Sequence, residues 1–219
     1  INICYMCFDA KTSMEGFIIS SIGTGMLYFS GDKNNEKFAY FWLSVTLIQL
    51  WEYFIWKNIK NKESNRFWTI ILRINIALQP LVALLVLNSV PSYLPKQLLQ
   101  AITLLSACFL AIYLHEIYEE RKDITVVNSN KNLKWPSTQP DNFSKLDLLR
   151  VSVYFLVLTI LPWFMKPLKT GITVGAIIVG SILLTFLKTE NYDIIKNSGW
   201  PSIWCYAASI MPILQYIII

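Results

Sequence analysis

Residues 38–56 read FAYFWLSVTLIQLWEYFIW. This stretch is long and apolar enough for a helix to cross the roughly 30 Å hydrocarbon core of a bilayer. It also carries one carboxylate, Glu52. A glutamate in hydrocarbon costs about 2.5 kcal/mol or more on insertion scales, so it requires an interior partner, a water-filled cavity or a function. The stretch therefore predicts a membrane helix that faces a polar interior.

Six further apolar stretches accompany this one, and short polar loops separate them. We expect a single integral membrane domain over residues 1–219, with an all-α fold: a polytopic transmembrane helix bundle of about seven spans. The longest loop, residues 119–145, is rich in Asn, Lys, Asp, Ser and Pro and is expected at the surface. The predicted spans are 12–30, 38–56, 67–88, 97–118, 146–165, 171–187 and 200–218.

The composition supports a membrane protein and excludes a nucleic-acid-binding role. Hydrophobic residues make up 54% of the chain and charged residues 15%, whereas a soluble domain carries about 25% charged residues. The net charge of +5 comes from basic residues in short loops, which is the pattern of a topology signal. Cys4 and Cys7 form a lone C-x-x-C, so no metal site is predicted, and the cofactors are unknown.

The basic loops also predict an orientation. With seven spans, twelve Lys and Arg residues fall on the side of the N-terminus and five on the other side. Because loops rich in Lys and Arg stay inside, we expect the N-terminus inside and the C-terminus outside. The twelve are Lys11, Lys57, Lys60, Lys62, Arg66, Arg121, Lys122, Lys131, Lys134, Lys145, Lys188 and Lys196, and the five are Lys33, Lys37, Lys96, Lys166 and Lys169.

This topology places the ionisable residues of the spans at one depth, near the inner side. Glu52 lies five residues before Lys57, about 7 Å from the inner boundary, and Arg73 lies about 10 Å beyond Arg66. The inner layer also contains the ionisable residues Glu15, His115, Glu116 and Arg150, and the indole of Trp204 lies at the same depth. The layer is the predicted ligand-binding or ion-binding region.

Amide side chains extend the layer. Gln49 precedes Glu52 by three residues and shares its helix face, and Asn75 and Gln79 are four residues apart. Pro80, which follows Gln79, is expected to kink its span and free a backbone carbonyl. Glu15 near a span end can instead snorkel to the headgroups, and a Glu52–Arg73 pair can be either structural or functional.

Residues 6–9 read Met-Cys-Phe-Asp, residues 49–52 give Gln-x-x-Glu, and residues 202–208 read Ser-Ile-Trp-Cys-Tyr-Ala-Ala. These three elements together resemble an uncharacterised family of multi-pass membrane proteins, mostly bacterial. The family opens with Met-Cys-Phe-Ser and ends with Ser-x-Trp-Cys-Phe-x-Ala-Ala, so Asp9 and Tyr206 depart from it. The resemblance implies a helical membrane fold and no known activity.

Three functions fit these observations. The first is a transporter or channel for a small cation, a proton or a small solute, in which Glu52 binds the cargo and Gln49 and Gln79 orient it. The second is a structural or assembly subunit of a larger membrane complex, with homo-oligomers or other membrane partners. The third is an intramembrane enzyme acting on lipid, disfavoured because the sequence has no His pair and no Ser elbow. The sequence does not say which membrane holds the protein.

Overall fold

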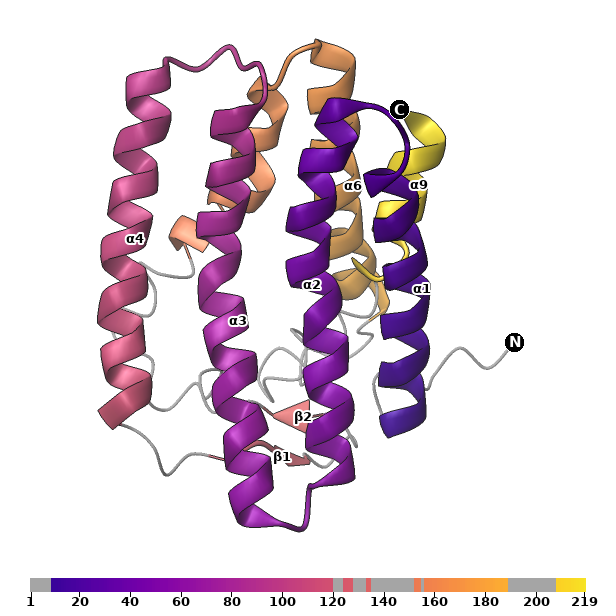
Figure 1. The fold of residues 1–219 in the computed structure, drawn as a ribbon, viewed down its shortest axis with the longest axis vertical. Coiled ribbons are helices and arrows are strands. Elements are labelled where there is room, and N and C mark those ends of the chain that lie inside the picture. The colour runs from indigo at the N-terminus through magenta and orange to yellow at the C-terminus, as the bar shows by residue number, and fades with distance from the viewer. Residues whose placement is uncertain (1–8, 120–123, 128–132, 135–151, 155, 189–207) are drawn as a thin grey trace.

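Four long helices lie in an antiparallel row in the computed structural model (Figure 1). The structure describes residues 9–119, 124–127, 133–134, 152–154, 156–188 and 208–219. We call the end of the bundle with the α2–α3 turn the lower end, and the opposite end the upper end, as Figure 1 shows them. The four helices are α1 (Ala10–Tyr28), α2 (Lys33–Lys57), α3 (Lys62–Ser89) and α4 (Lys96–Glu119).

The later part of the chain packs behind and beside this row. A π-helical turn, η3 (Leu156–Ile160), and a 3₁₀ turn, η4 (Leu161–Phe164), lead into α6 (Leu168–Lys188). The last helix, α9 (Met211–Ile218), lies against α1 and ends near the upper end (Figure 1). Two short antiparallel strands, β1 (Val126–Val127) and β2 (Leu133–Lys134), lie near the lower end.

The predicted all-α fold is confirmed. The spans expected at 12–30, 38–56, 67–88 and 97–118 each coincide with one long helix, and the span at 171–187 coincides with α6. Within the described residues, α2, α3 and α4 are long and apolar enough to cross a membrane. Much of 146–165 and 200–218 lies outside the described residues, so the count of seven spans and the orientation remain predictions.

Two local expectations differ from the structure. The span predicted at 146–165 ends in the two short turns η3 and η4, because Pro162 lacks an amide hydrogen and cannot continue an α-helical ladder. The loop predicted at 119–145 includes the two short strands β1 and β2. In contrast, α3 continues as one helix through Pro80.

Side-chain caps fix where the first three helices begin. Asp9 Oδ1 accepts a hydrogen bond from the Thr12 amide at 2.8 Å, and Asp32 Oδ1 accepts bonds from two amides of the first turn of α2. Asn61 caps α3 in the same way. These side chains satisfy amide groups that a helix leaves without partners at its start. Gly31, with a φ of +78°, makes the sharp α1–α2 connection that other residues rarely adopt.

Small residues let the helices approach closely. A methyl group on Gly23 of α1 would lie 2.6 Å from Ile213 Cγ1 and 2.8 Å from the Ile213 amide nitrogen, so α9 rests directly on this glycine. On α6, Gly171 lies against the Pro162 carbonyl and Gly175 against the Trp163 ring. The Gly171-x-x-x-Gly175 spacing therefore serves packing within the chain.

The apolar core runs along the bundle and includes Ile55 and Leu72 toward its lower end. On α2, Phe38, Phe41, Val45 and Ile48 recur every three or four residues and form one buried face. They belong to one cluster with residues of α3, η3 and α6. Glu52 follows Ile48 by four residues and precedes the buried Ile55 by three, so it is a carboxylate within this face.

Candidate functional site

The predicted site residues divide into a buried group and an exposed group. The buried group lies on two helices: Gln49 and Glu52 on α2, and Arg73, Asn75 and Gln79 on α3. Glu15 is half exposed and lies 3.8 Å from Lys11, one turn away on α1. His115 is exposed near the end of α4, and Trp204 lies outside the described residues. The structure therefore concentrates the described candidates at the α2–α3 pair.

Asn75 and Gln79 form a hydrogen-bonded network whose centre is the backbone carbonyl of Ser44. In the orientation that satisfies both ends of its amide, Asn75 donates to Ser44 O and accepts from Trp51 Nε1, both at 2.9 Å. Gln79 donates to the same carbonyl at 3.3 Å and accepts from the Tyr154 hydroxyl at 2.5 Å. Because both amides are satisfied at both ends, this network joins α2 to α3 structurally.

Arg73 is almost fully buried and contacts Tyr113 of α4. Its Nε donates to the Tyr113 hydroxyl at 3.4 Å, and its guanidinium carbon lies 5.5 Å from the centre of the Tyr113 ring. A cation near an aromatic ring is stabilised by the ring's electrons, and this effect grows when both groups leave water. The predicted pairing of Arg73 with Glu52 remains a prediction.

Gln49 differs from the other buried amides. Its side chain is fully buried, and neither the oxygen nor the nitrogen of its amide has a hydrogen-bond partner among the described residues. A buried amide without partners costs about 1–3 kcal/mol. A native structure retains such a group when a water, an ion or a ligand completes its bonds, or when the group has a functional role.

A small polar contact region surrounds this amide. A methyl group on Gly16 of α1 would lie 3.0 Å from Gln49 Oε1 and 3.2 Å from the hydroxyl oxygen of Ser209. Gly16 therefore brings two oxygen atoms from two other segments close to the α1 backbone. Glu52 lies about one turn below Gln49, about 60° around α2, and is also fully buried. Together these groups offer amide, hydroxyl and carboxylate chemistry at one level of the bundle.

Two further polar networks lie at the contact of α2 with α1 and α9, and the sequence did not single them out. Thr46 bonds to Ser20 at 2.5 Å and to Thr24 at 3.3 Å through their hydroxyl oxygens. Nearer the upper end, Trp42 Nε1 donates to Gln215 Oε1 at 2.7 Å, and Gln215 Nε2 donates to Asn35 Oδ1 at 3.4 Å. Both networks could have been found from the sequence, because Thr46 and Gln215 are polar residues inside predicted apolar spans.

A third network holds the segment that follows α4 against the lower end of α3. Asn65 donates from its amide to the Thr125 carbonyl at 2.9 Å and accepts from the Thr125 amide at 3.1 Å. The hydroxyl of Thr69 contacts that of Thr125 at 2.8 Å. All three residues are buried, so this network fixes a loop that the sequence placed at the surface.

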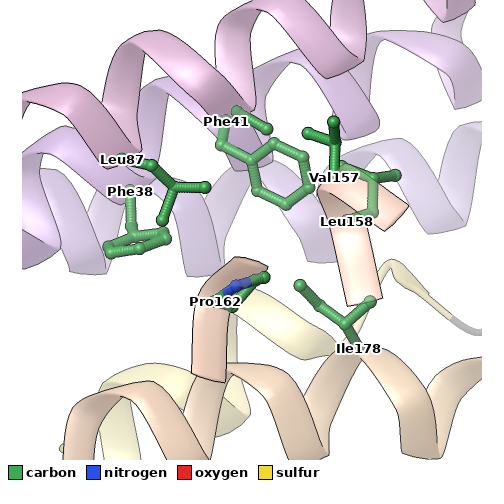
Figure 2. A pocket seen from close by; sticks show the side chains of 8 residues that line it. Phe38, Phe41, Leu87, Val157, Leu158, Pro162 and Ile178 are labelled. Carbon is green, nitrogen blue, oxygen red and sulfur yellow. The ribbon is translucent and has the colours of Figure 1, made fainter. Parts of the chain in front are cut away.

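The apolar core of the bundle contains a small cavity of about 10 Å³ (Figure 2). Figure 2 shows Phe41, Val157 and Ile178 around it, from α2, η3 and α6. No polar side chain lines this cavity, so it offers no hydrogen bonds to a ligand. The complete lining is Phe38, Phe41, Ala83, Leu87, Val157, Leu158, Pro162 and Ile178.

Neither a metal-binding cluster nor a relative of known function assigns a role to these residues. Among the described residues, no three His, Cys, Asp or Glu side chains gather closely enough to hold a metal ion. No family model, no curated protein and no solved structure matches the chain. The resemblance to a family of multi-pass membrane proteins therefore remains a prediction.

Proposed function

We propose that this protein is a multi-pass integral membrane protein that transports a small cation, a proton or a small solute through a polar site on α2. The observation that supports this most is Gln49, a fully buried amide with no hydrogen-bond partner among the described residues. Its position one turn from the buried Glu52 adds a group that carries charge. A purely structural role would favour satisfied amides such as those of Asn75 and Gln79.

The outward faces of the helices support a lipid environment. On α4, Leu104 is 68% exposed and Tyr118 is 61% exposed, and Leu98, Leu105 and Ile112 are also exposed. A soluble protein rarely exposes a continuous apolar patch of this kind. In a bilayer the same side chains contact acyl chains, and the polar groups turn inward.

The proposed roles follow from the chemistry of each group. Glu52 holds a proton or balances the charge of a cation, and the Gln49 amide orients the cargo because it both donates and accepts hydrogen bonds. Arg73, held by Tyr113, supplies positive charge on the neighbouring helix. The Asn75–Gln79 network holds α2 and α3 in register around these groups.

A structural or assembly subunit is the second candidate, and the exposure of α4 is the observation that favours it. Only 11% of the most apolar 18-residue segment of α4 is buried. The exposed side of α4 can pack on another membrane protein as well as on lipid. Stable co-purification of a partner, together with no ion flux from the isolated protein, would support this candidate over transport.

Reconstitution into liposomes tests the proposed transport. Proton, Na⁺ and K⁺ fluxes are measured for the wild type and for Glu52→Gln, with Glu36→Gln as the control. Glu36 lies on the same helix but is exposed near the upper end, so the substitution is matched and leaves the site intact. We expect flux of at least one of these ions, unchanged in Glu36→Gln and lost in Glu52→Gln. Flux equal to that of empty liposomes for the wild type, with small solutes also excluded, would overturn transport.

A further inference from the structure

Polar side chains recur along one face of α2. Asn35, Trp42, Thr46 and Gln49 are separated by seven, four and three residues, so they share the face that contacts α1 and α9. Each of them is buried. From Asn35 to Glu52 the helix rises by about 25 Å, close to the roughly 30 Å thickness of a bilayer core. We call this set, with its partners on α1 and α9, the α2 seam.

On the interior side of α2, the face directly above Glu52 is apolar, and the nearby amides of Asn75 and Gln79 are held by the Ser44 carbonyl. Above Glu52 this face presents Ile48, Val45, Phe41 and Phe38, and the small cavity beside the two phenylalanines has an apolar lining (Figure 2). Gln49 lies between Glu52 and Thr46 on the helix surface, about 60° from each. Among the described residues of α2, Gln49 is therefore the seam residue that lies nearest to Glu52 along the helix.

The middle of the seam consists of hydroxyl groups in direct contact. Thr46 lies 2.5 Å from Ser20 and 3.3 Å from Thr24, oxygen to oxygen. A hydroxyl can accept a proton on a lone pair while it donates its own, so a row of them can relay protons. Contacts this short leave no space between the oxygens for a hydrated metal ion. The geometry of the seam thus suits a proton better than Na⁺ or K⁺.

The upper part of the seam stops such a relay. The indole N–H of Trp42 donates to Gln215, and an indole nitrogen has no lone pair with which to accept a proton. Gln215 in turn donates to Asn35, so an indole and two amides close the upper end. All three side chains are buried, and α9 is held against α1 by the close contact at Gly23.

We propose that the α2 seam is a proton path and that the Trp42–Gln215–Asn35 network is its gate. This rests on the proposed transport function and specifies its ion and route. A proton taken up by the Glu52 carboxylate passes, through a water bound by the Gln49 amide, to the Thr46, Ser20 and Thr24 hydroxyls. Each hydroxyl gains one proton on a lone pair and gives up its own. Because the Thr46 hydroxyl donates to the Trp42 carbonyl at 2.8 Å in the structure, its O–H must turn toward a neighbouring hydroxyl for the transfer and turn back afterwards. Passage to the upper side requires the gate network to separate.

Proteoliposomes containing a pH-sensitive dye test the path. Under an imposed pH gradient, Thr46→Val should lower the proton flux about tenfold or more, because a positioned relay group speeds proton transfer by at least about that factor. Thr69→Val is the matched control: Thr69 is equally buried and bonded to other side chains, but it lies on α3 outside the seam. Its flux should equal that of the wild type.

A substitution in the gate network should raise the proton flux, whereas one in the hydroxyl path should lower it. Gln215→Leu removes the partner of Trp42, and flux should rise about fivefold, the factor by which one lost hydrogen bond shifts a closed-to-open equilibrium. Asn88→Leu is the control, since Asn88 bonds to Thr103 between α3 and α4. Circular dichroism and monodisperse elution confirm the fold of each variant.

The outcomes separate this proposal from the transport function on which it rests. If Glu52→Gln abolishes proton flux while Thr46→Val and Gln215→Leu both behave as the wild type, the seam and its gate are wrong and transport stands. Flux of Na⁺ or K⁺ without proton flux overturns the seam in the same way. If the wild type carries none of the three ions, the proton path is excluded.

Discussion

Gln49 and Gln79 carry the same amide, yet their surroundings give them different roles. The sequence predicted that both would lie in a polar interior, and both are fully buried. It could not predict that Tyr154 and the Ser44 carbonyl would satisfy Gln79, because those contacts join residues 35 and 75 positions apart. Gln49 has no such partner among the described residues, which makes it the functional candidate of the two.

This difference predicts that replacing the two glutamines by leucine changes the free energy of unfolding by different amounts. Gln79→Leu should lower the free energy of unfolding by about 1–3 kcal/mol, because it removes the buried amide that bonds to the Ser44 carbonyl and to the partly buried Tyr154 hydroxyl. Gln49→Leu should cost less than about 1 kcal/mol or stabilise the protein, since it removes a buried amide that lacks protein partners. Denaturant unfolding in detergent measures both values. Equal losses in the two variants would show that Gln49 is held by the protein in the same way as Gln79.

Two glycines of α1 provide a second residue-scale test. Gly23→Ala should destabilise the protein by about 1–3 kcal/mol, because the added methyl would overlap Ile213 and force α9 away from α1. Gly25→Ala should stabilise it by up to about 1 kcal/mol, because the site is open and alanine favours the helix. Thermal unfolding in detergent compares the two. A stabilising Gly23→Ala would mean that α9 does not rest on α1.

Among the secondary-structure elements, a long continuous apolar stretch predicted a helix correctly, whereas the short turns and strands were not predicted. The long apolar stretches became α1, α2, α3, α4 and α6. The turns η3 and η4 escaped prediction because their shape depends on contacts of Pro162 and Trp163 with Gly171 and Gly175 on α6. The strands β1 and β2 lie in a segment predicted as a polar loop, and β1 follows Thr125, which is bonded to Asn65, a contact that no local pattern reveals.

The start of α1 gives a prediction on pH. The Thr12 amide donates to the Asp9 carboxylate, which lowers the pKa of Asp9 below its ordinary value of 3.8. A lowered pKa in the folded state means that Asp9 contributes stability above pH 3.8, and that this contribution is lost as the pH falls through the lowered value. Asp9→Ala should cost about 1 kcal/mol at pH 7.

Asp9→Asn is the control for this effect, because asparagine caps a helix without titrating. Unfolding measured from pH 7 down to pH 3 should show the gap between wild type and Asp9→Ala narrowing at the acidic end. The gap between Asp9→Asn and Asp9→Ala should stay constant over the same range. A wild-type gap that does not change with pH would mean that the carboxylate charge plays no part in the cap.

At the scale of the whole molecule, lysines lie at the two ends of the bundle, and buried polar and apolar side chains lie between them. Lys33, Lys37 and Lys96 lie at the upper ends of their helices, and Lys11 and Lys57 at the lower ends of theirs (Figure 1). The sequence predicted one inner layer of ionisable groups, and the structure buries Glu52 and Arg73 but leaves Glu15 and His115 exposed. Depth along the chain was predictable, because helices rise regularly. Which face each residue occupies depended on how the helices pack.

The two ends of the bundle allow a direct test of orientation. In a background in which Cys4, Cys7, Cys108 and Cys205 are replaced by serine, Lys60→Cys and Lys96→Cys place single thiols at the lower and upper ends. The α2–α3 turn at the lower end carries Lys57, Lys60, Lys62 and Arg66. Because loops rich in Lys and Arg stay inside, the lower end should lie on the inner side of the membrane. A membrane-impermeant maleimide added to intact cells should therefore label Lys96→Cys and leave Lys60→Cys unlabelled until detergent is added. Labelling of Lys60→Cys alone would invert the topology, and equal labelling of both in intact cells would contradict a bundle that crosses the membrane with its ends on opposite sides.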